Sequence, residues 1–238
     1  MTAFDLSAAF DNVPHDILLK KLDIYGVKGK ENAWINSFLS ERVQKVRWGK
    51  TLSTARKVPW GTPQGSCLSP LLFLIYTADL DEYLEVVQAY SYADDTTTFA
   101  SGKDEQEVQH NLEKDAVNLL KYMSANLLVA NADKTQFMIA NGCADGGPIR
   151  VGDADIRRAE EIELLGMRVD KTLGFSKHME ALTKSLQQRT GLLQRLSHHI
   201  PKKELRLVAE GICISKLRYG LAAYGIPRMS QDEPRRAL

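Results

Sequence analysis

Two adjacent carboxylates, Asp94 and Asp95, are the residues of this chain best placed to do chemistry. An apolar and aromatic run, 89–93, precedes them and a threonine-rich run, 96–99, follows, which predicts a strand, a tight turn and a second strand. Adjacent strand residues point to opposite faces of a sheet, so only a turn lets both carboxylates approach one centre. Such a pair suits a hard divalent cation such as Mg²⁺, as phosphoryl transfer requires, although Asp-Asp is also common in plain solvated turns.

Two further segments could contribute to the same centre. Asp5 ends a short predicted strand, 3–6, and could meet the acids of a hairpin tip if the strands are neighbours. The backbone carbonyl of Leu6 would add another oxygen. The loop 61–66 carries glycines that let backbone approach a ligand closely. Taken singly, Asp5 could equally cap a helix or turn, and the loop could simply lead into the helix that follows.

The composition describes an ordinary globular chain with an uneven distribution of charge. Its 238 residues, 44% hydrophobic and 26% charged, are enough for one large domain or two small ones. Residues 42–57 hold six Lys/Arg and no acid, residues 58–102 hold six acids and no Lys/Arg, and residues 177–218 hold nine Lys/Arg and three acids. An acidic middle between basic segments fits a metal centre between nucleic-acid-binding surfaces, although three solvated faces would give the same pattern.

Targeting signals and cysteine usage indicate an intracellular protein. No apolar run approaches the length of a membrane span, and the first residues lack the apolar core of a signal peptide. Cys67, Cys143 and Cys213 are widely spaced and odd in number, which fits a reducing compartment without a disulfide framework or a zinc site. We therefore expect a nuclear or cytoplasmic protein that is neither secreted nor bound in a membrane.

The spacing of apolar residues predicts helices mixed with short strands. Asn12 is the expected cap of the first helix, Gly26 its stop, and 142–147 the best boundary between domains. Helices are expected at 14–25, 31–39, 71–83, 104–128, 177–196 and 202–221. A basic hairpin is expected at 43–52, and further strands at 135–140, 149–156 and 162–169.

Five segments, in this order, resemble those of reverse transcriptases from non-long-terminal-repeat (LINE-type) retrotransposons. They are FDLSAAFDNVPH at 4–15, GTPQGSCLSPLLF at 61–73, YADD at 92–95, NADKT at 131–135, and LLG at 164–166 with Asp170 and LGF at 173–175. The resemblance implies an α+β fold, a polymerase palm with a small antiparallel sheet packed on helices, followed by a helical thumb. It divides the chain into palm (1–141), end of palm with a primer-grip hairpin (142–175) and thumb-like region (176–238).

The resemblance also implies a role for each matching residue of the catalytic centre. Asp5 and Asp94 correspond to the ligands of two Mg²⁺ ions, for which Mn²⁺ is a possible substitute. The Leu6 carbonyl and Asp95 belong to the same metal site. Lys134 corresponds to a lysine that protonates the leaving pyrophosphate or holds its charge. Asp5, Asp94, Asp95 and Lys134 are therefore the expected catalytic residues.

Further residues correspond to the family's contacts with nucleotide and nucleic acid. Phe10 matches a ring that lies under the sugar and excludes a 2′-hydroxyl, although it could also be a plain core aromatic. Gln64 and Gly65 match the loop that contacts the nascent base pair and the template, and Leu165 and Gly166 match the primer grip. The implied partners are an RNA template, a DNA primer and dNTP.

The match also departs from the family pattern. In the family a fingers subdomain precedes the position of Asp5 and supplies Lys/Arg for the triphosphate, and an endonuclease region accompanies the polymerase. Neither is expected here, so we expect a truncated polymerase that is weak or inactive alone. Three alternatives stay open: a group II intron-type reverse transcriptase, a non-catalytic nucleic-acid-binding remnant, and an unselected gene product.

Overall fold

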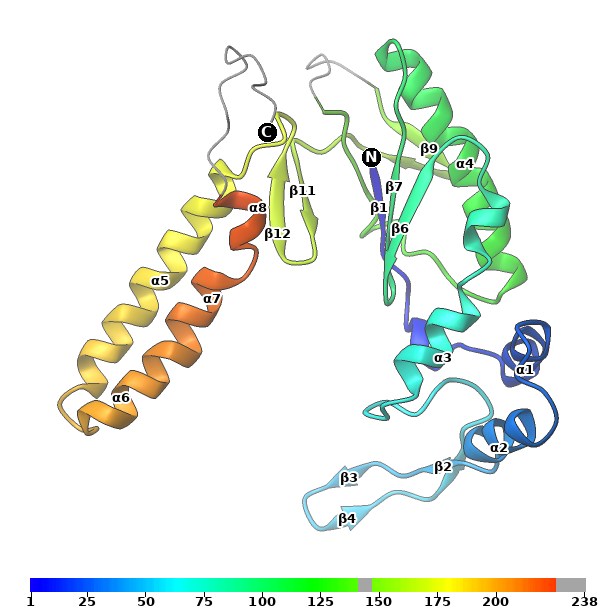
Figure 1. Ribbon diagram of the computed structural model, residues 1–238, viewed down its shortest axis with the longest axis horizontal. Coiled ribbons are helices and arrows are strands. Elements are labelled where there is room, and N and C mark those ends of the chain that lie inside the picture. The colour runs from blue at the N-terminus through cyan, green and yellow to red at the C-terminus, as the bar shows by residue number, and fades with distance from the viewer. Residues whose placement is uncertain (141–146, 226–238) are drawn as a thin grey trace, which may run out of the picture. The chain divides into compact units, whose positions relative to one another are not determined.

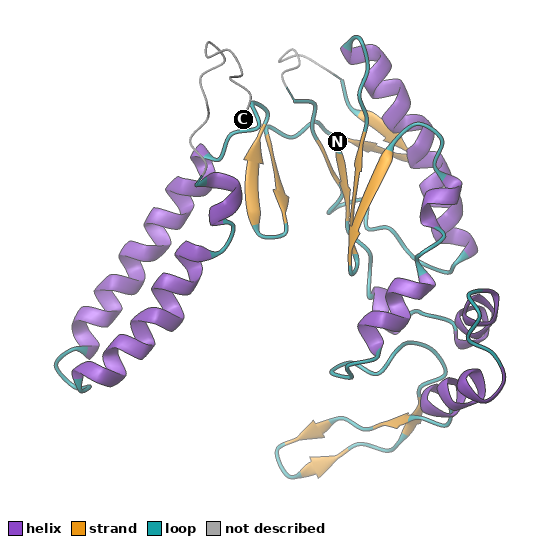
Figure 2. Cartoon of the chain, viewed as in Figure 1, coloured by secondary structure: helices purple, strands orange, loops and turns teal. Residues whose placement is uncertain are grey.

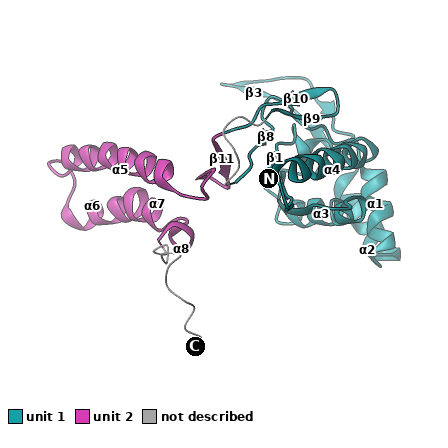
Figure 3. Ribbon diagram, turned by 90° about the horizontal axis from the view of Figure 1, so that it is seen from above, with its two compact units in different colours: residues 1–159 teal, residues 160–238 magenta. Residues whose placement is uncertain are grey.

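The computed structural model describes residues 1–140 and 147–225. The chain divides into two compact units, Met1–Ala159 and Glu160–Leu238 (Figure 3), and each is described by itself. Helices and small antiparallel sheets are mixed along the chain (Figure 2), so the predicted α+β class is confirmed. In the part of the chain that the structure describes, no helix combines the length and apolar character needed to cross a bilayer.

A four-stranded sheet with the order β6-β7-β1-β8 forms the centre of the first unit (Figure 1). Its strands are β1 (Thr2–Phe4), β6 (Gln88–Tyr92), β7 (Asp95–Phe99) and β8 (Gln136–Phe137). β1 pairs antiparallel with both β7 and β8, so the start of the chain lies between two strands that are distant in sequence.

The longest helix of this unit, α4 (Glu105–Ala125), supplies much of the core. Asp104 caps it by accepting a hydrogen bond from the Glu107 amide at 2.8 Å. The helix expected at 104–128 is confirmed, and its buried side chains are spaced three and four residues apart at Leu112, Ala116, Leu119 and Met123. A hairpin of β9 (Ile149–Val151) and β10 (Ala154–Ile156) packs against α4 through β9.

Three shorter helices complete the body of the first unit: α1 (His15–Ile24), α2 (Gly29–Leu39) and α3 (Ser69–Tyr76). Gly26, with φ 92°, ends α1 as predicted. The prediction that Asn12 caps α1 is wrong, since its side chain donates to the Ser7 carbonyl at 3.0 Å and α1 begins after Pro14 without a side-chain cap. The helix expected at 71–83 is α3 followed by a separate 3₁₀ turn, η2 (Leu80–Tyr83).

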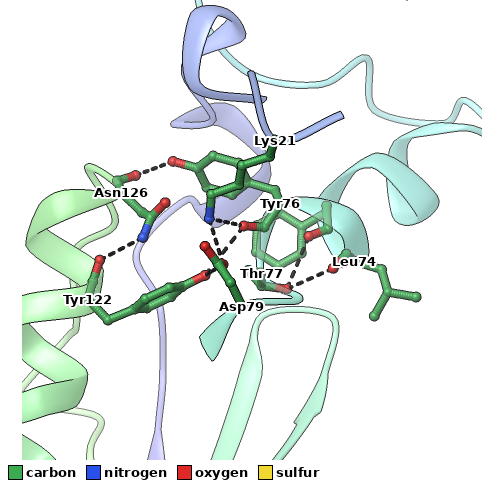
Figure 4. Close-up of polar contacts among 8 residues, drawn as sticks. Lys21, Leu74, Tyr76, Thr77, Asp79, Tyr122 and Asn126 are labelled. Atoms are coloured by element: carbon green, nitrogen blue, oxygen red, sulfur yellow. Dashed lines mark hydrogen bonds and ion pairs between the residues drawn. The ribbon is translucent and has the colours of Figure 1, made fainter. Parts of the chain in front are cut away.

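A buried polar network joins α1, α3 and α4 (Figure 4). The Lys21 ammonium donates to the Tyr76 carbonyl at 2.6 Å and to Asp79 Oδ1 at 2.7 Å, and the Tyr122 hydroxyl donates to the same carboxylate at 2.8 Å. The Tyr76 hydroxyl donates to the Asn126 carbonyl. Burial raises the pKa of both tyrosine hydroxyls, so each stays a neutral donor.

A two-stranded ribbon follows α2 and is longer than the hairpin expected at 43–52. β2 (Val43–Gln44) pairs with β5 (Arg56–Lys57), and β3 (Arg47–Trp48) pairs with β4 (Thr51–Leu52). Gly49, with φ 59°, opens the turn between β3 and β4, where a left-handed residue suits the twist of the ribbon.

The second unit begins with a hairpin and continues as helices. β11 (Glu161–Leu164) pairs with β12 (Met167–Asp170), and α5 (Ser176–Leu196) follows. The remaining elements are α6 (Lys202–Ala209), a π-helical turn η3 (Glu210–Ile214), α7 (Ser215–Arg218) and α8 (Leu221–Tyr224). The helix expected at 202–221 therefore runs to Arg218.

Two predictions about residues 142–175 need revision. The runs 149–156 and 162–169 were each expected as strand, and each is a hairpin of two short strands. The expected boundary at 142–147 falls almost wholly outside the described residues, whereas the compact units divide after Ala159. The three regions 1–141, 142–175 and 176–238 do not coincide with these units and stay a prediction.

Replacing Lys21 by Met should destabilise the protein by about 3 kcal/mol, because it leaves the Asp79 carboxylate partly buried without its cation. The side chains of Lys21 and Asp79 are only 11% and 24% exposed. The matched control is Lys114→Met, which breaks a 2.7 Å pair with Glu85 whose side chains are 42% and 57% exposed, and should cost under about 1 kcal/mol. Urea unfolding midpoints measure both, and equal losses would contradict the role of the network.

Candidate functional site

The pairing of β1 with β7 places Asp5 beside the Asp94-Asp95 hairpin. The register runs from Thr2 opposite Thr98 to Phe4 opposite Thr96, and continuing it by one residue puts Asp5 opposite Asp95. Asp5 and Asp94 are partly buried and Asp95 is exposed. The sheet thus brings together the three acids that the sequence singled out, at one end of its central strands.

The hairpin that carries two of these acids turns tightly. Tyr92 pairs with Asp95, so Ala93 and Asp94 alone form the turn between β6 and β7. Ala93 has φ 54°, a left-handed conformation that a residue with a Cβ adopts at a cost of about 1 kcal/mol or more. Strained turns of this kind occur where the surrounding structure must hold a side chain in a fixed position.

The acids repel one another. Although Asp95 is exposed, partial desolvation of its carboxyl by the surrounding protein raises its pKa above the usual value, and the charges of Asp94 and then Asp5 raise it further. A shift in this direction means that the ionised form of Asp95 lacks a compensating positive charge.

Lys134 forms an ion pair with Asp5. Its Nζ lies 3.2 Å from Asp5 Oδ2, and that oxygen is buried yet makes no hydrogen bond. Lys134 lies in a turn that starts at Asn131, whose amide donates to the Asp5 carbonyl at 2.8 Å and whose own carbonyl accepts from the Thr135 amide at 3.0 Å. The turn that carries Lys134 is therefore hydrogen-bonded to Asp5, the residue with which Lys134 pairs.

The bridge between Leu6 and Ala130 indicates where the Leu6 carbonyl points. The two hydrogen bonds of this bridge are made by the residues on either side of Leu6: the Asp5 carbonyl accepts from the Asn131 amide, and the Ser7 amide donates to the Val129 carbonyl. In an antiparallel pair of this type the middle residue turns its own carbonyl to the opposite edge. On that edge lies the hairpin β6–β7.

These groups fit a hard cation. The donors are carboxylate and carbonyl oxygens, the ligands that Mg²⁺ and similar ions prefer, and Asp5 offers a buried oxygen without a hydrogen bond. Within residues 1–140 and 147–225 no group of three or more His, Cys, Asp or Glu side chains is already spaced to enclose a metal ion. A cation at Asp5 and Asp94 would relieve the repulsion that the metal-free acids show.

The loop 61–66 is docked on the segment that follows β1. The Gly61 amide donates to the Val13 carbonyl at 2.8 Å and the Thr62 amide to the Phe10 carbonyl at 2.8 Å. Gln64 is exposed, and its Nε2 donates to Asp11 Oδ1 at 2.9 Å. The structure thus joins the first two sequence segments into one surface, with Gly65, at φ 81°, at its rim.

Phe10 belongs to the same surface. It lies in the 3₁₀ turn η1 (Ala9–Asp11), and its ring stacks on Phe73 of α3 with centroids 4.5 Å apart. The ring is partly buried, so it packs on the core and also keeps an accessible edge. Both interpretations of Phe10, as a core aromatic and as a ring under the sugar, agree with this position.

The predicted primer-grip residues belong to the second unit. Leu165 and Gly166 form the turn between β11 and β12, with φ 49° and φ 77°. The Tyr219 hydroxyl donates to the Leu165 carbonyl, which fixes the turn on the helical part of that unit.

Sequence reasoning missed two polar residues that hold the loop. Asp11 accepts from Gln64, and His15 Nε2 lies 2.8 Å from the Gly61 carbonyl, to which it donates. Both lie in the segment 4–15, so the signal was present, but nothing local indicated that these side chains reach residues about fifty positions away.

A family model described as "Reverse transcriptase (RNA-dependent DNA polymerase)" matches residues 1–169. The chain belongs to the reverse transcriptase family. It is 28% identical over 249 residues to a probable RNA-directed DNA polymerase from transposon BS of Drosophila melanogaster, and 26% identical over 246 residues to that from the mobile element jockey of the same species. Each alignment covers 95% of this chain and 26% of the relative, so the chain spans about a quarter of their length.

A solved structure supports the fold. The telomerase of Candida tropicalis, solved with a fragment of telomeric RNA, superposes with a TM-score of 0.51 at 14% identity, over 93% of this chain and 38% of that one. The expectations of a LINE-type reverse transcriptase, an α+β polymerase fold and a nucleotidyltransferase family are confirmed. Reverse transcriptases as a family use divalent metal ions.

Asp95→Asn should stabilise the metal-free protein at neutral pH. The raised pKa means that the folded state holds the Asp95 proton more tightly than the unfolded state, so stability falls as pH rises from the unfolded value, about 3.9, through the folded one. The gain should therefore shrink as pH falls toward 4. Urea unfolding in EDTA across this range measures it, and a gain independent of pH would contradict the repulsion.

Gly61→Ala should destabilise the protein by about 3 kcal/mol, because the new Cβ meets backbone at a left-handed φ. At φ 84° it would lie 2.7 Å from the Asp11 carbonyl oxygen. Gly65→Ala is the matched control: φ is 81°, nothing lies within 4 Å, and the strain alone should cost about 1–2 kcal/mol. Equal losses in thermal unfolding would show that the close approach to Asp11 is unimportant.

Proposed function

We propose that this chain is the polymerase region of a non-long-terminal-repeat retrotransposon reverse transcriptase. It would transfer a nucleotidyl group from dNTP to the 3′-hydroxyl of a DNA primer paired with an RNA template. One observation carries the proposal: the family's acids, Asp5 and Asp94-Asp95, meet at one end of the sheet, and Asp5 there keeps a buried oxygen without a hydrogen bond next to Lys134.

The carboxylates of Asp5 and Asp94, with Asp95 and the Leu6 carbonyl, would hold two Mg²⁺ ions, for which Mn²⁺ could substitute. When bound, such ions lower the pKa of the attacking hydroxyl and neutralise triphosphate charge. The chain itself contributes oxygen ligands from two neighbouring strands. Because these carboxylates repel one another, binding of a cation between them is favourable.

Lys134 has a second part in this proposal. Its exposed ammonium is held near Asp5 by a turn hydrogen-bonded to the same strand. Once the Asp5 carboxylate is otherwise engaged, the ammonium becomes available to hold the charge of the leaving pyrophosphate or to give it a proton.

The surface formed by Phe10 and the loop 61–66 would receive the nucleotide and the template. Because Phe10 is stacked on Phe73, its ring cannot easily swing away, so it can exclude a 2′-hydroxyl by bulk and favour dNTP. Asp11 fixes the amide of Gln64, and Gly65 lets the backbone approach a base pair. Leu165 and Gly166 would contact the primer end.

Primer extension on an RNA template tests this function. We expect weak, Mg²⁺-dependent synthesis, reduced about 100-fold or more in Asp94→Asn, because losing a metal-holding carboxylate removes several kcal/mol of transition-state stabilisation. The control is Asp16→Asn, an exposed acid of α1 outside the site, which should extend primers like wild type.

Thermal unfolding gives a readout that does not need activity. Mg²⁺ should raise the midpoint of wild type and of Asp16→Asn but not of Asp5→Asn, since only the last loses a ligand. Mg²⁺ effects that are equal in all three proteins would contradict the metal site.

A further inference from the structure

The ribbon at residues 42–57, here called the basic hairpin, has a composition unlike the rest of the first unit. It holds six cations and no acid. Among the described residues none of the six takes part in an ion pair. The six are Arg42, Lys45, Arg47, Lys50, Arg56 and Lys57. The hairpin therefore presents a concentrated positive charge that the described part of the chain does not neutralise.

The basic hairpin also exposes large apolar side chains. Trp48 is 86% exposed, Val46 69% and Leu52 56%, and every residue from 42 to 57 is exposed. β2 lies beside α2, and the ribbon runs out from there to β3 and β4 (Figure 1). A two-stranded ribbon whose residues are all exposed is marginally stable in water, so a ligand that covers it would also order it.

Charge and aromatic content together indicate the occupant. The cores of protein interfaces are depleted in charge, whereas here cations alternate with apolar residues along the strands. Lysine and arginine neutralise phosphates, and an exposed indole stacks on a base, which must be unpaired to offer its face. Trp48 lies next to the turn at Gly49, where a strand of RNA can reach its ring.

The base of the hairpin leads toward the proposed active surface. A cavity of about 630 Å³ is lined by Arg42 and Lys57 from the hairpin, by Trp60, by Gln64 from the docked loop, and by Asp11 from η1. Positive charge thus continues from the tip of the hairpin to the loop that is expected to contact the template.

We propose that the basic hairpin binds single-stranded RNA, the template ahead of the site of synthesis. Trp48 stacks on an unpaired base, Lys45, Arg47 and Lys50 hold the adjacent phosphates, and Arg42 and Lys57 guide the strand to Gln64. The identity of the RNA as template rests on the proposed function, but the binding itself needs neither metal nor catalysis.

Fluorescence anisotropy with the full chain in EDTA, without dNTP, tests the inference. The probe is a labelled 12-nucleotide oligoadenylate. Trp48→Ala should weaken binding by about 5- to 150-fold, the range found for loss of one stacked base. The matched control is Trp34→Ala on α2, a tryptophan 60% exposed outside the basic hairpin, which should bind within about twofold of wild type.

Charge is tested separately by the salt dependence. The triple variant Lys45→Gln, Arg47→Gln, Lys50→Gln should weaken binding and lower the slope of log K against log salt by about 2, since each phosphate contact to a single strand contributes about 0.7. Its control is Lys28→Gln with Lys30→Gln, two exposed lysines at the start of α2, which should leave the slope unchanged. All substituted side chains are exposed, and circular dichroism checks that the fold is kept.

Other ligands give the opposing outcomes. A 12-base-pair RNA duplex should bind at least about tenfold more weakly than the single strand, and single-stranded DNA should bind similarly to RNA because both offer unpaired bases. Equal affinity for the duplex, an equal loss in Trp34→Ala and Trp48→Ala, or binding to vesicles of phosphatidylcholine and phosphatidylserine but not to RNA would overturn the inference.

Asp94→Asn separates the two proposals, because it should bind the oligoadenylate as wild type does while losing primer extension. Primer extension without Trp48-dependent RNA binding would overturn the inference and leave the proposed function standing. Trp48-dependent RNA binding without any primer extension would overturn the proposed function and leave RNA binding by the hairpin standing.

Discussion

The register of β1 between β7 and β8 is the constraint on which the candidate site depends. Because side chains alternate along a strand, a slip of one residue would turn Asp5 to the other face and away from Asp95. The pairing with β8 and the bridge from Leu6 to Ala130 fix the same strand from its other edge, and they bring the turn of Lys134 to the same end. One short central strand thus positions acids and lysine from three distant parts of the sequence.

The charges at this end of the sheet do not balance within the protein. Lys134 offsets part of the charge of Asp5, yet Asp5 Oδ2 makes no hydrogen bond and the pKa of Asp95 is raised by partial desolvation and by its acidic neighbours. A fold tolerates such repulsion only if other interactions hold the strands in place. The network of Lys21, Tyr76, Asp79 and Tyr122 fixes the helices of the same unit, since its hydrogen bonds join α1, α3 and α4. Within one unit, charges are therefore paired in the network that stabilises the helices, and like charges are brought together at the candidate site.

Local sequence patterns predicted the elements better than their pairing. The spacing of apolar residues placed the long helix at 104–128, and α4 spans Glu105–Ala125, because that spacing acts within a few residues. The strand expected at 162–169 proved to be a hairpin, since Leu165 takes a left-handed conformation that leucine rarely adopts. The strand expected at 149–156 is also a hairpin, and there Gly152 and Asp153 form the turn, so the local signal was present. The Asn12 side chain donates a hydrogen bond to the preceding Ser7 carbonyl and does not cap the helix that follows. The order β6-β7-β1-β8 follows from long-range pairing, so only the family resemblance, and not periodicity, could bring Asp5 to Asp95.

The charge asymmetry of the sequence acquires a structural meaning in the same way. The acidic stretch 58–102 contains no Lys or Arg. From the sequence alone, no positive group was therefore expected near the docked loop. In the structure the loop shares a cavity with Arg42 and Lys57, which come from the preceding basic stretch. The base of the hairpin thus places two cations beside an uncharged loop of the acidic stretch, where a polyanion can be held. The positive charge lies on an exposed ribbon and not in the packed core, which avoids the cost of desolvating buried lysines and arginines. It also lies outside the four-stranded sheet that carries the acids.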